Sequence, residues 1–166
     1  MTNKEKHIKL FCDGSVNPKS NVGYGAYFIL DSTSIIELSQ IDIFTKKFEN
    51  TSSTKLELET LLWALKDSYL QNIEVFVYTD CQNILTLQNR RKKLEQNHFY
   101  TKKGELLKNH LLYKDFYKLS DSLNCEFIKV KGHKKLNEKD EIDKLFTLVD
   151  RASREHLRNY NLKVNL

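Results

Sequence analysis

Two aspartates follow strand-like segments of this sequence and could bind a metal ion together. Asp13 comes after the alternating residues 8–12, and Asp80 follows the mostly apolar segment Glu74–Thr79. In open α/β sheets, ligands bind beyond the carboxyl ends of the strands, so neighbouring strands would bring these carboxylates together. Carboxylates that gather without a cation repel one another and raise each other's pKa. The pair therefore predicts a site for a hard divalent cation, Mg²⁺ or Mn²⁺.

Acidic residues of this kind also have purely structural interpretations. Asp13 with Gly14 could form a turn, and Asp80 could cap the helix that follows it. Glu57 could close a capping box with Thr54, because three positions separate them. The metal interpretation gains support only when the acids are taken together, in their order along one chain.

The elements that must position these acids begin with three expected strands. Residues 8–12 alternate and lead into Asp13, and Tyr24–Leu30 is a second apolar segment. A turn-rich stretch follows, and Ile35–Ile43 has strand-like spacing, so the three strands are expected to form an antiparallel meander.

A helix is expected next, because side chains at 51–54 can cap a helix start and apolar residues then recur at helical spacing. The apolar positions are Leu58, Leu61, Leu62, Leu65 and Tyr69. Glu74–Thr79 reads as a buried strand, and a strand that follows a helix of this length is expected to run parallel to an earlier one. The sheet should therefore be mixed.

The remaining segments complete an order of βββαβ, helices, β and α. Helical sequence occupies much of Gln82–Leu123, Cys125–Val130 reads as a fifth strand, and a last helix is expected near Ile142–Arg158. The 166 residues, 40% of them hydrophobic and 30% charged, suit one folded domain over 1–166.

Composition also limits the cellular setting and the partners. Nothing near the amino terminus resembles a signal sequence, no apolar run is long enough for a membrane span, and the three cysteines form no zinc or disulfide pattern. We therefore expect a cytoplasmic protein without a membrane anchor. We also expect it to be a monomer that uses no small-molecule cofactor. The net charge of +5 suits a polyanionic partner. Positive residues concentrate between Asn83 and Asp115, including Arg90, Arg91, Lys92 and Lys93.

Four motifs, taken in order, resemble type 1 ribonuclease H over nearly the whole chain. They are Asp13-Gly14-Ser15 with Gly23-Tyr24-Gly25-Ala26, Thr54-Lys55-Leu56-Glu57-Leu58 with Ala64-Leu65, Tyr78-Thr79-Asp80-Cys81-Gln82, and Val130-Lys131-Gly132-His133. The resemblance implies an α/β ribonuclease H-like fold, with a five-stranded mixed sheet in order 3-2-1-4-5 whose first three strands are antiparallel, flanked by helices. It also implies an Asp-Glu-Asp-Asp set that binds two Mg²⁺ ions, with Mn²⁺ able to substitute.

The first three members of that set map onto Asp13, Glu57 and Asp80. Helical periodicity alone does not choose between Glu57 and Glu59, and the family pattern favours Glu57. The same resemblance gives His133 an auxiliary role in proton transfer or product release.

The fourth carboxylate has two candidates. Asp143 has the usual spacing from the loop histidine, whereas Asp150 has the better local match, with small residues after it. Asp150 could also simply pair with Arg154 at i+4 on a solvated helix face. We take Asp150 as the ligand and keep Asp143 as the alternative.

The implied activity is hydrolysis of the RNA strand of RNA/DNA hybrids, leaving 5′-phosphate and 3′-hydroxyl ends. Five positions are placed to contact or admit the hybrid: Gly14, Asn17, Ser52, Ser53 and Gln82. Ser52-Ser53 stands where the family often has paired asparagines. The basic residues Arg90, Arg91, Lys92 and Lys93 are expected to hold phosphates. The alternatives are a weakly active or inactive nucleic-acid-binding module of the same fold, or another two-metal enzyme such as an integrase.

Overall fold

The computed structural model describes residues 6–32, 36–67, 70–131 and 134–165. Five strands form one mixed sheet in the order β3-β2-β1-β4-β5. They are β1 (His7–Asn17), β2 (Val22–Asp31), β3 (Phe44–Phe48), β4 (Glu74–Thr79) and β5 (Asn124–Lys129). The first three strands pair antiparallel, while β4 runs parallel to both β1 and β5. The predicted fold class and strand order are confirmed.

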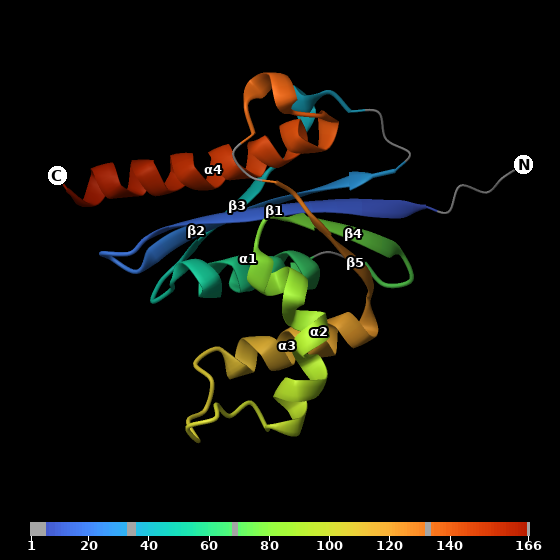
Figure 1. Ribbon diagram of the computed structural model, residues 1–166. Coiled ribbons are helices and arrows are strands. Elements are labelled where there is room, and N and C mark those ends of the chain that lie inside the picture. Colours follow the sequence, from blue (N-terminus) through green and yellow to red (C-terminus); the bar gives the residue numbers. More distant parts are fainter. Residues whose placement is uncertain (1–5, 33–35, 68–69, 132–133, 166) are drawn as a thin grey trace, which may run out of the picture.

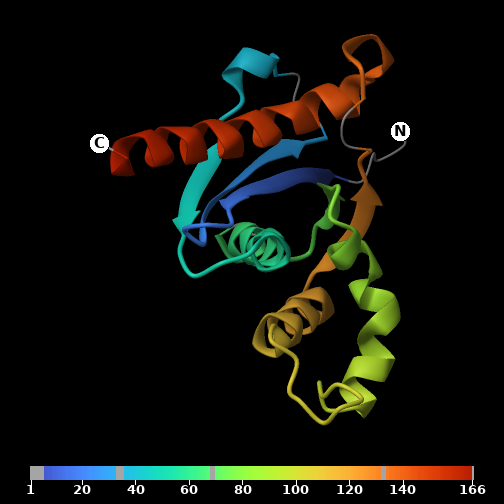
Figure 2. The same ribbon diagram turned by 60° about the vertical axis from the view of Figure 1, so that its left-hand side comes forward.

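Helices cover both faces of this sheet (Figure 1). On one face lie α1 (Ser53–Asp67), α2 (Gln82–Gln96) and α3 (His110–Ser122), and α4 (Glu141–Val164) crosses the other. Figure 2 shows α2 and α3 extending away from the sheet as a pair, joined at their far end by a loop. No helix in the described ranges is long and apolar enough to cross a membrane.

Alternation along β1 supplies a hydrophobic core to each face. Leu10 and Cys12 pack into the cluster under α1, where Leu58, Leu61, Leu62 and Leu65 are also buried. Phe11 points the other way, under α4, and stacks between Phe28 and Tyr78 at ring-centroid distances of 4.8 and 4.6 Å. Helical periodicity thus identified the buried face of α1 correctly, although Tyr69 lies outside the described residues.

The turn interpretation of Asp13 and Gly14 is wrong, because β1 continues through both residues to Asn17. Gly14 lies opposite Gly25 of β2. A Cβ on Gly14 would come within 2.9 Å of Leu56 Cγ, and a Cβ on Gly25 would overlap the Thr60 hydroxyl. Gly23 meets Leu56 in the same way. These glycines therefore allow α1 to lie close against the sheet.

The third strand also differs from the sequence prediction. It is Phe44–Phe48, which pairs with residues 23–27 of β2, and the described part of the predicted strand holds a short 3₁₀ helix at Leu38–Gln40. Ile36 and Leu38, on which the strand-like spacing of the segment rested, are exposed, whereas Ile41 and Ile43 are partly buried against the cluster under α4. The apolar spacing of this segment therefore indicated neither strand pairing nor consistent burial.

Candidate metal centre and substrate groove

Three carboxylates from separate elements meet at one edge of the β1–β4 pair. One oxygen from each of Asp13, Glu57 and Asp80 lies within 4.8 Å of the other two. The last pair of the β1–β4 ladder is Phe11 with Tyr78, so both aspartates lie just beyond the point where parallel pairing ends. Glu57 reaches the same place from the first turns of α1. Residues far apart in sequence thus form one acidic cluster.

Glu57 and its rival Glu59 have different surroundings. The Glu59 carboxylate accepts a hydrogen bond from Thr51 Oγ1 at 2.7 Å, which ties it to the residues before α1. Glu57 instead contacts Asp13, and its buried Oε2 atom has no hydrogen-bond partner among the described residues. The alternative capping role does not need Glu57, because Ser52 accepts from the Lys55 backbone N–H at 3.4 Å at this helix start.

Asp80 is likewise not the residue that caps the next helix. The N-cap position of α2 belongs to Cys81, and Asp80 stands between it and β4. Asp80 lines the same groove as Asp13 and Glu57. Its position fits the acidic cluster better than the capping interpretation.

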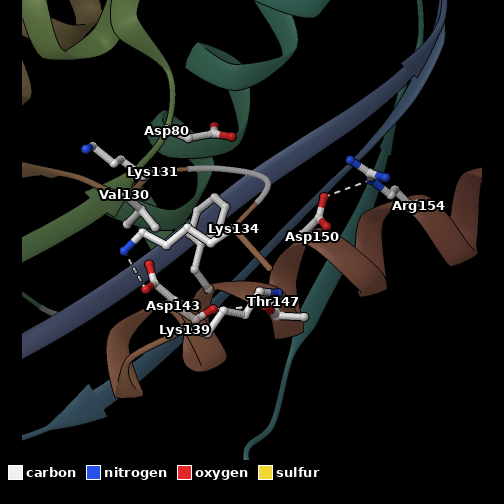
Figure 3. A pocket seen from close by; sticks show the side chains of 10 residues that line it. Asp80, Val130, Lys131, Lys134, Lys139, Asp143, Thr147, Asp150 and Arg154 are labelled. Atoms are coloured by element: carbon white, nitrogen blue, oxygen red, sulfur yellow. Dashed lines mark hydrogen bonds and ion pairs between the residues drawn. The ribbon is translucent and has the colours of Figure 1, made fainter. Parts of the chain in front are cut away.

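The two candidates for the fourth carboxylate have different partners. Asp150 lies near enough to Asp13 to raise the pKa of that carboxyl, and it lines the groove with the other three acids. It is not one of the three acids whose oxygens lie within 4.8 Å of one another. It also forms an ion pair with Arg154, Nε to Oδ1 at 2.8 Å (Figure 3). The i+4 pair expected from sequence is therefore present, and Asp150 forms it while also lining the groove beside the cluster.

Asp143 is occupied in holding the start of α4. Its carboxylate accepts from Lys134 Nζ at 2.7 Å and from the Asp140 backbone N–H at 3.1 Å, completing a capping box. The Lys134 ammonium lowers the pKa of Asp143. In Figure 3 this ion pair and the Asp150–Arg154 pair lie at separate points along α4.

The acidic cluster is electrostatically strained without a cation. Burial and the Asp80 carboxylate raise the pKa of Asp13 to about 8, and Asp150 adds to the rise. Burial, together with Asp13 and Asp80, also raises the pKa of Glu57. Metal ligands must lose their protons, so binding of a cation here should release protons near neutral pH.

We expect the metal-free protein to lose stability as the pH rises from about 4 to about 8. The folded-state pKa of Asp13 is raised from its ordinary value of 3.8 to about 8, so the favourable contribution of the protonated form is lost progressively between these two values and does not change above them. Asp13→Asn should make the stability depend less on pH, because asparagine does not ionise. Each kcal/mol of stability that is kept at high pH should raise Tm by about 2–4 °C. Thermal melts in EDTA across this range test it. Glu59→Gln is the control, and an unchanged pH slope in Asp13→Asn would count against the proposed strain.

The predicted substrate-binding residues are placed around the same groove or near it. Gly14, Ser53 and Gln82 line the groove itself. Ser52 lies next to Ser53 and is exposed, and its hydroxyl takes part in the start of α1. Asn17 is at the end of β1, where its amide donates to Asn161 Oδ1 of α4 at 3.2 Å.

The predicted basic residues divide into two kinds. Arg91 pairs with Asp121 of α3 and with Glu95, so it joins α2 to α3. Arg90 donates to Asn83 and lies over the Tyr113 ring. Lys92 and Lys93 are exposed on the projecting helix. These two lysines are the members of the set whose charge is open to solvent.

Two further outcomes concern the neighbourhood of the groove. His133 lies outside the described residues. Arg154 was expected only as a partner for Asp150, yet it lines the groove directly. Its i+4 spacing from Asp150, followed by Arg158 four residues later, was the available signal.

Comparisons with known proteins agree with this geometry. The sequence model of the RNase H family matches residues 5–149. A relative named Ribonuclease H, from Acetivibrio thermocellus, is 30% identical over 146 residues, covering 86% of this chain and 93% of the relative. The solution structure of the PFV RNase H domain has a TM-score of 0.69 at 18% identity, covering 91% of this chain and 94% of that one.

A foamy viral protease-reverse transcriptase structure, in complex with dsDNA, has a TM-score of 0.61 at 12% identity, covering 89% of this chain and 93% of that one. These solved structures share the fold. The family match covers three of the four acids and ends one residue before Asp150. From the family match and the 30% identical relative, the chain belongs to the RNase H family.

Proposed function

We propose that this protein is a Mg²⁺-dependent endoribonuclease of the type 1 ribonuclease H kind, which hydrolyses the RNA strand of RNA/DNA hybrids. The observation that carries the proposal is the convergence of Asp13, Glu57 and Asp80 within 4.8 Å. An acidic cluster at this sheet edge, in a chain of the RNase H family, supports phosphodiester hydrolysis. The same cluster argues against an inactive nucleic-acid-binding module, because a protein that only binds nucleic acid does not need a cluster of carboxylates.

The donor set fits a hard divalent cation. Four carboxylates line the groove, and the Oε2 atom of Glu57, which has no hydrogen-bond partner in the part of the chain that the structure describes, supplies a buried acceptor that a cation would satisfy. When bound, two Mg²⁺ ions would supply the positive charge that activates the attacking water and stabilises the leaving 3′ oxygen. Products with 5′-phosphate and 3′-hydroxyl ends are expected. Mn²⁺ offers similar coordination and should substitute.

The protein's own residues orient this chemistry. Asp13 and Asp80 are fixed by the two central strands, and Glu57 by α1, so the ligands are held before any cation arrives. Arg154 holds Asp150 beside them through the 2.8 Å ion pair. Preorganised charges of this kind need little rearrangement during reaction.

Selection of RNA opposite DNA is proposed to rest on the polar residues around the groove. The 2′-hydroxyl is the group that distinguishes RNA from DNA locally, and it is both a donor and an acceptor. Backbone at Gly14 and the side chains of Ser53 and Gln82 border the acids, so they are placed to contact it. Asn17, Ser52, Lys92 and Lys93 would extend these contacts along the backbone, and His133 would assist product release. No small-molecule cofactor and no second subunit are required.

Purified protein with Mg²⁺ should cut the RNA strand of a hybrid and spare single-stranded RNA and duplex DNA. The assay compares the three substrates, each labelled at the 5′ end, with Mg²⁺, with Mn²⁺ and with EDTA. Asp80→Asn is the matched control, because it removes one ligand charge without removing the side chain. Folding of the control is checked by circular dichroism.

Absence of cleavage with either ion, while the protein binds the hybrid, would favour the inactive binding module instead. Equal cleavage of free RNA would contradict the proposed selectivity. Activity that survives Asp80→Asn would show that the cleavage comes from a contaminant or from another site.

A further inference from the structure

The carboxyl-terminal half of α4 carries a stripe of hydrogen-bond donors that begins at the acidic cluster. With 3.6 residues per turn, positions four, four, three and four residues apart lie on one side of a helix. From Asp150, these positions are Arg154, Arg158, Asn161 and Asn165. At about 1.5 Å per residue the stripe is about 22 Å long. It therefore extends well beyond the metal centre.

The stripe is continuous with the substrate groove. Arg154 lines the groove that contains the four acids, and it also begins a second, shallow groove along α4. Arg158, Asn161 and Asn165 line that second groove, and Leu157 and Leu162 form the rest of its lining. Arg154 thus lines both grooves, so a polymer that leaves the groove at the acids could continue along the groove on α4.

Apart from Arg154, which pairs with Asp150, the cations of this segment are exposed and have no ion pair in the described ranges. Residues 151–165 contain Arg151, Arg154, Arg158 and Lys163 against Glu155, so four minus one gives +3. Arg158 is exposed, and its guanidinium has no ion pair or hydrogen bond with any residue in the described ranges. It differs in this from Arg91, whose charge is neutralised by Asp121 and Glu95.

The helix that presents the stripe is held in place by its other side. Tyr160 packs near Tyr24 of β2, with ring centroids 6.1 Å apart, and the Lys47 ammonium of β3 lies 4.7 Å from the Tyr160 ring centre. On the stripe itself, Asn161 accepts the hydrogen bond from Asn17. A fixed surface loses less side-chain entropy on binding than a mobile one.

We propose that this stripe is a phosphate track, which binds the sugar-phosphate backbone of the hybrid where it leaves the metal centre. The inference rests on the proposed function for its ligand. Guanidinium groups match phosphate oxygens in charge and in planar hydrogen-bond geometry, and the two asparagine amides add neutral donors. The track is separate from the projecting α2–α3 pair, so the hybrid would be held at two places on the protein.

Arg158→Gln tests the track without touching the acidic cluster. Each phosphate contact contributes about 0.9 to the slope of log affinity against log salt, so loss of one contact should reduce the slope by that amount. The same rule gives a weakening of up to about 8-fold at 0.1 M salt. Binding of an RNA/DNA hybrid of about two helical turns is measured by fluorescence anisotropy in EDTA, from 50 to 200 mM salt.

Lys163→Gln is the matched control, because it removes the same charge from an exposed position about 140° further around the helix from Arg158. Arg158→Lys should restore most of the slope. The track is overturned if Arg158→Gln keeps the wild-type slope, if Lys163→Gln changes it equally, or if the wild type does not bind the hybrid.

Cleavage with Mg²⁺ is measured on the same preparations. If the wild type cleaves the hybrid but Arg158→Gln does not change hybrid binding, the phosphate track is wrong and the proposed function stands. If Arg158→Gln weakens hybrid binding but the wild type does not cleave the hybrid, the proposed function is wrong and the phosphate track is supported.

Discussion

Asp150→Asn is expected to lose at least about 100-fold in hybrid cleavage, whereas Asp143→Asn should keep most of its activity. Replacing residues that merely orient metal ligands typically costs about 10–100-fold, so loss of a ligand charge should lie at or above that range. Asp150 lies near Asp13 and lines the groove, whereas Asp143 is occupied by Lys134 and the Asp140 backbone.

The same two variants should show the opposite order in stability. Asp143 is buried and makes charge-assisted hydrogen bonds, so Asp143→Asn should cost about 1–2 kcal/mol. The Asp150–Arg154 pair is partly exposed, and such pairs contribute about 0–1 kcal/mol. Steady-state cleavage and urea unfolding, measured on both variants, separate the two roles. Retained activity in Asp150→Asn together with loss in Asp143→Asn would reverse the assignment.

Glu57→Gln is expected to abolish measurable cleavage and to weaken metal binding, while Glu59→Gln stays within about twofold of the wild type. Glutamine keeps the shape of the side chain and loses the negative charge that attracts a hard cation. At position 59, the glutamine carbonyl can still accept the 2.7 Å hydrogen bond from Thr51. The two substitutions are chemically identical and only two residues apart, so each is a control for the other.

Metal binding by these variants is measured separately from cleavage. A cation that binds only the folded protein raises Tm, by an amount equivalent to about 2.7 kcal/mol at 100 times Kd. Wild type and Glu59→Gln should show this rise with Mg²⁺ or Mn²⁺, and Glu57→Gln should show a smaller one. Equal rises in all three proteins would mean that Glu57 is not a ligand.

The sheet was predictable from the sequence because its strands and helices carry strong local patterns. The β4 segment is an apolar run of strand length, and α1 repeats leucine at helical spacing. The third strand was misplaced because β3 shows weak alternation, with exposed lysines at 46 and 47. In the preceding segment Ile36 and Leu38 are exposed, and Ile41 and Ile43 are partly buried without strand pairing. Apolar spacing in a short segment therefore does not by itself identify a strand.

The acidic cluster was only partly predictable. Residues at strand ends could be placed by topology, which brought Asp13 and Asp80 together. Choosing between Glu57 and Glu59, or between Asp143 and Asp150, needed the direction of each side chain and the partners it meets. Periodicity places such residues on a helix but does not identify their partners. Thr51 holds Glu59 and Lys134 holds Asp143, and these contacts separate the two structural acids from Glu57 and Asp150.

The close contact of α1 with the glycines of β1 and β2 has a consequence for engineering. Leu56 and Thr60 touch Gly14, Gly23 and Gly25, and Glu57 lies between them in sequence. Core redesign that adds bulk beneath this helix, even if it improved packing elsewhere, would lift Glu57 away from Asp13. Efforts to make the protein more heat-resistant should therefore leave this contact unchanged and look for gains at the far end of the α2–α3 pair, away from Gln82 and the groove.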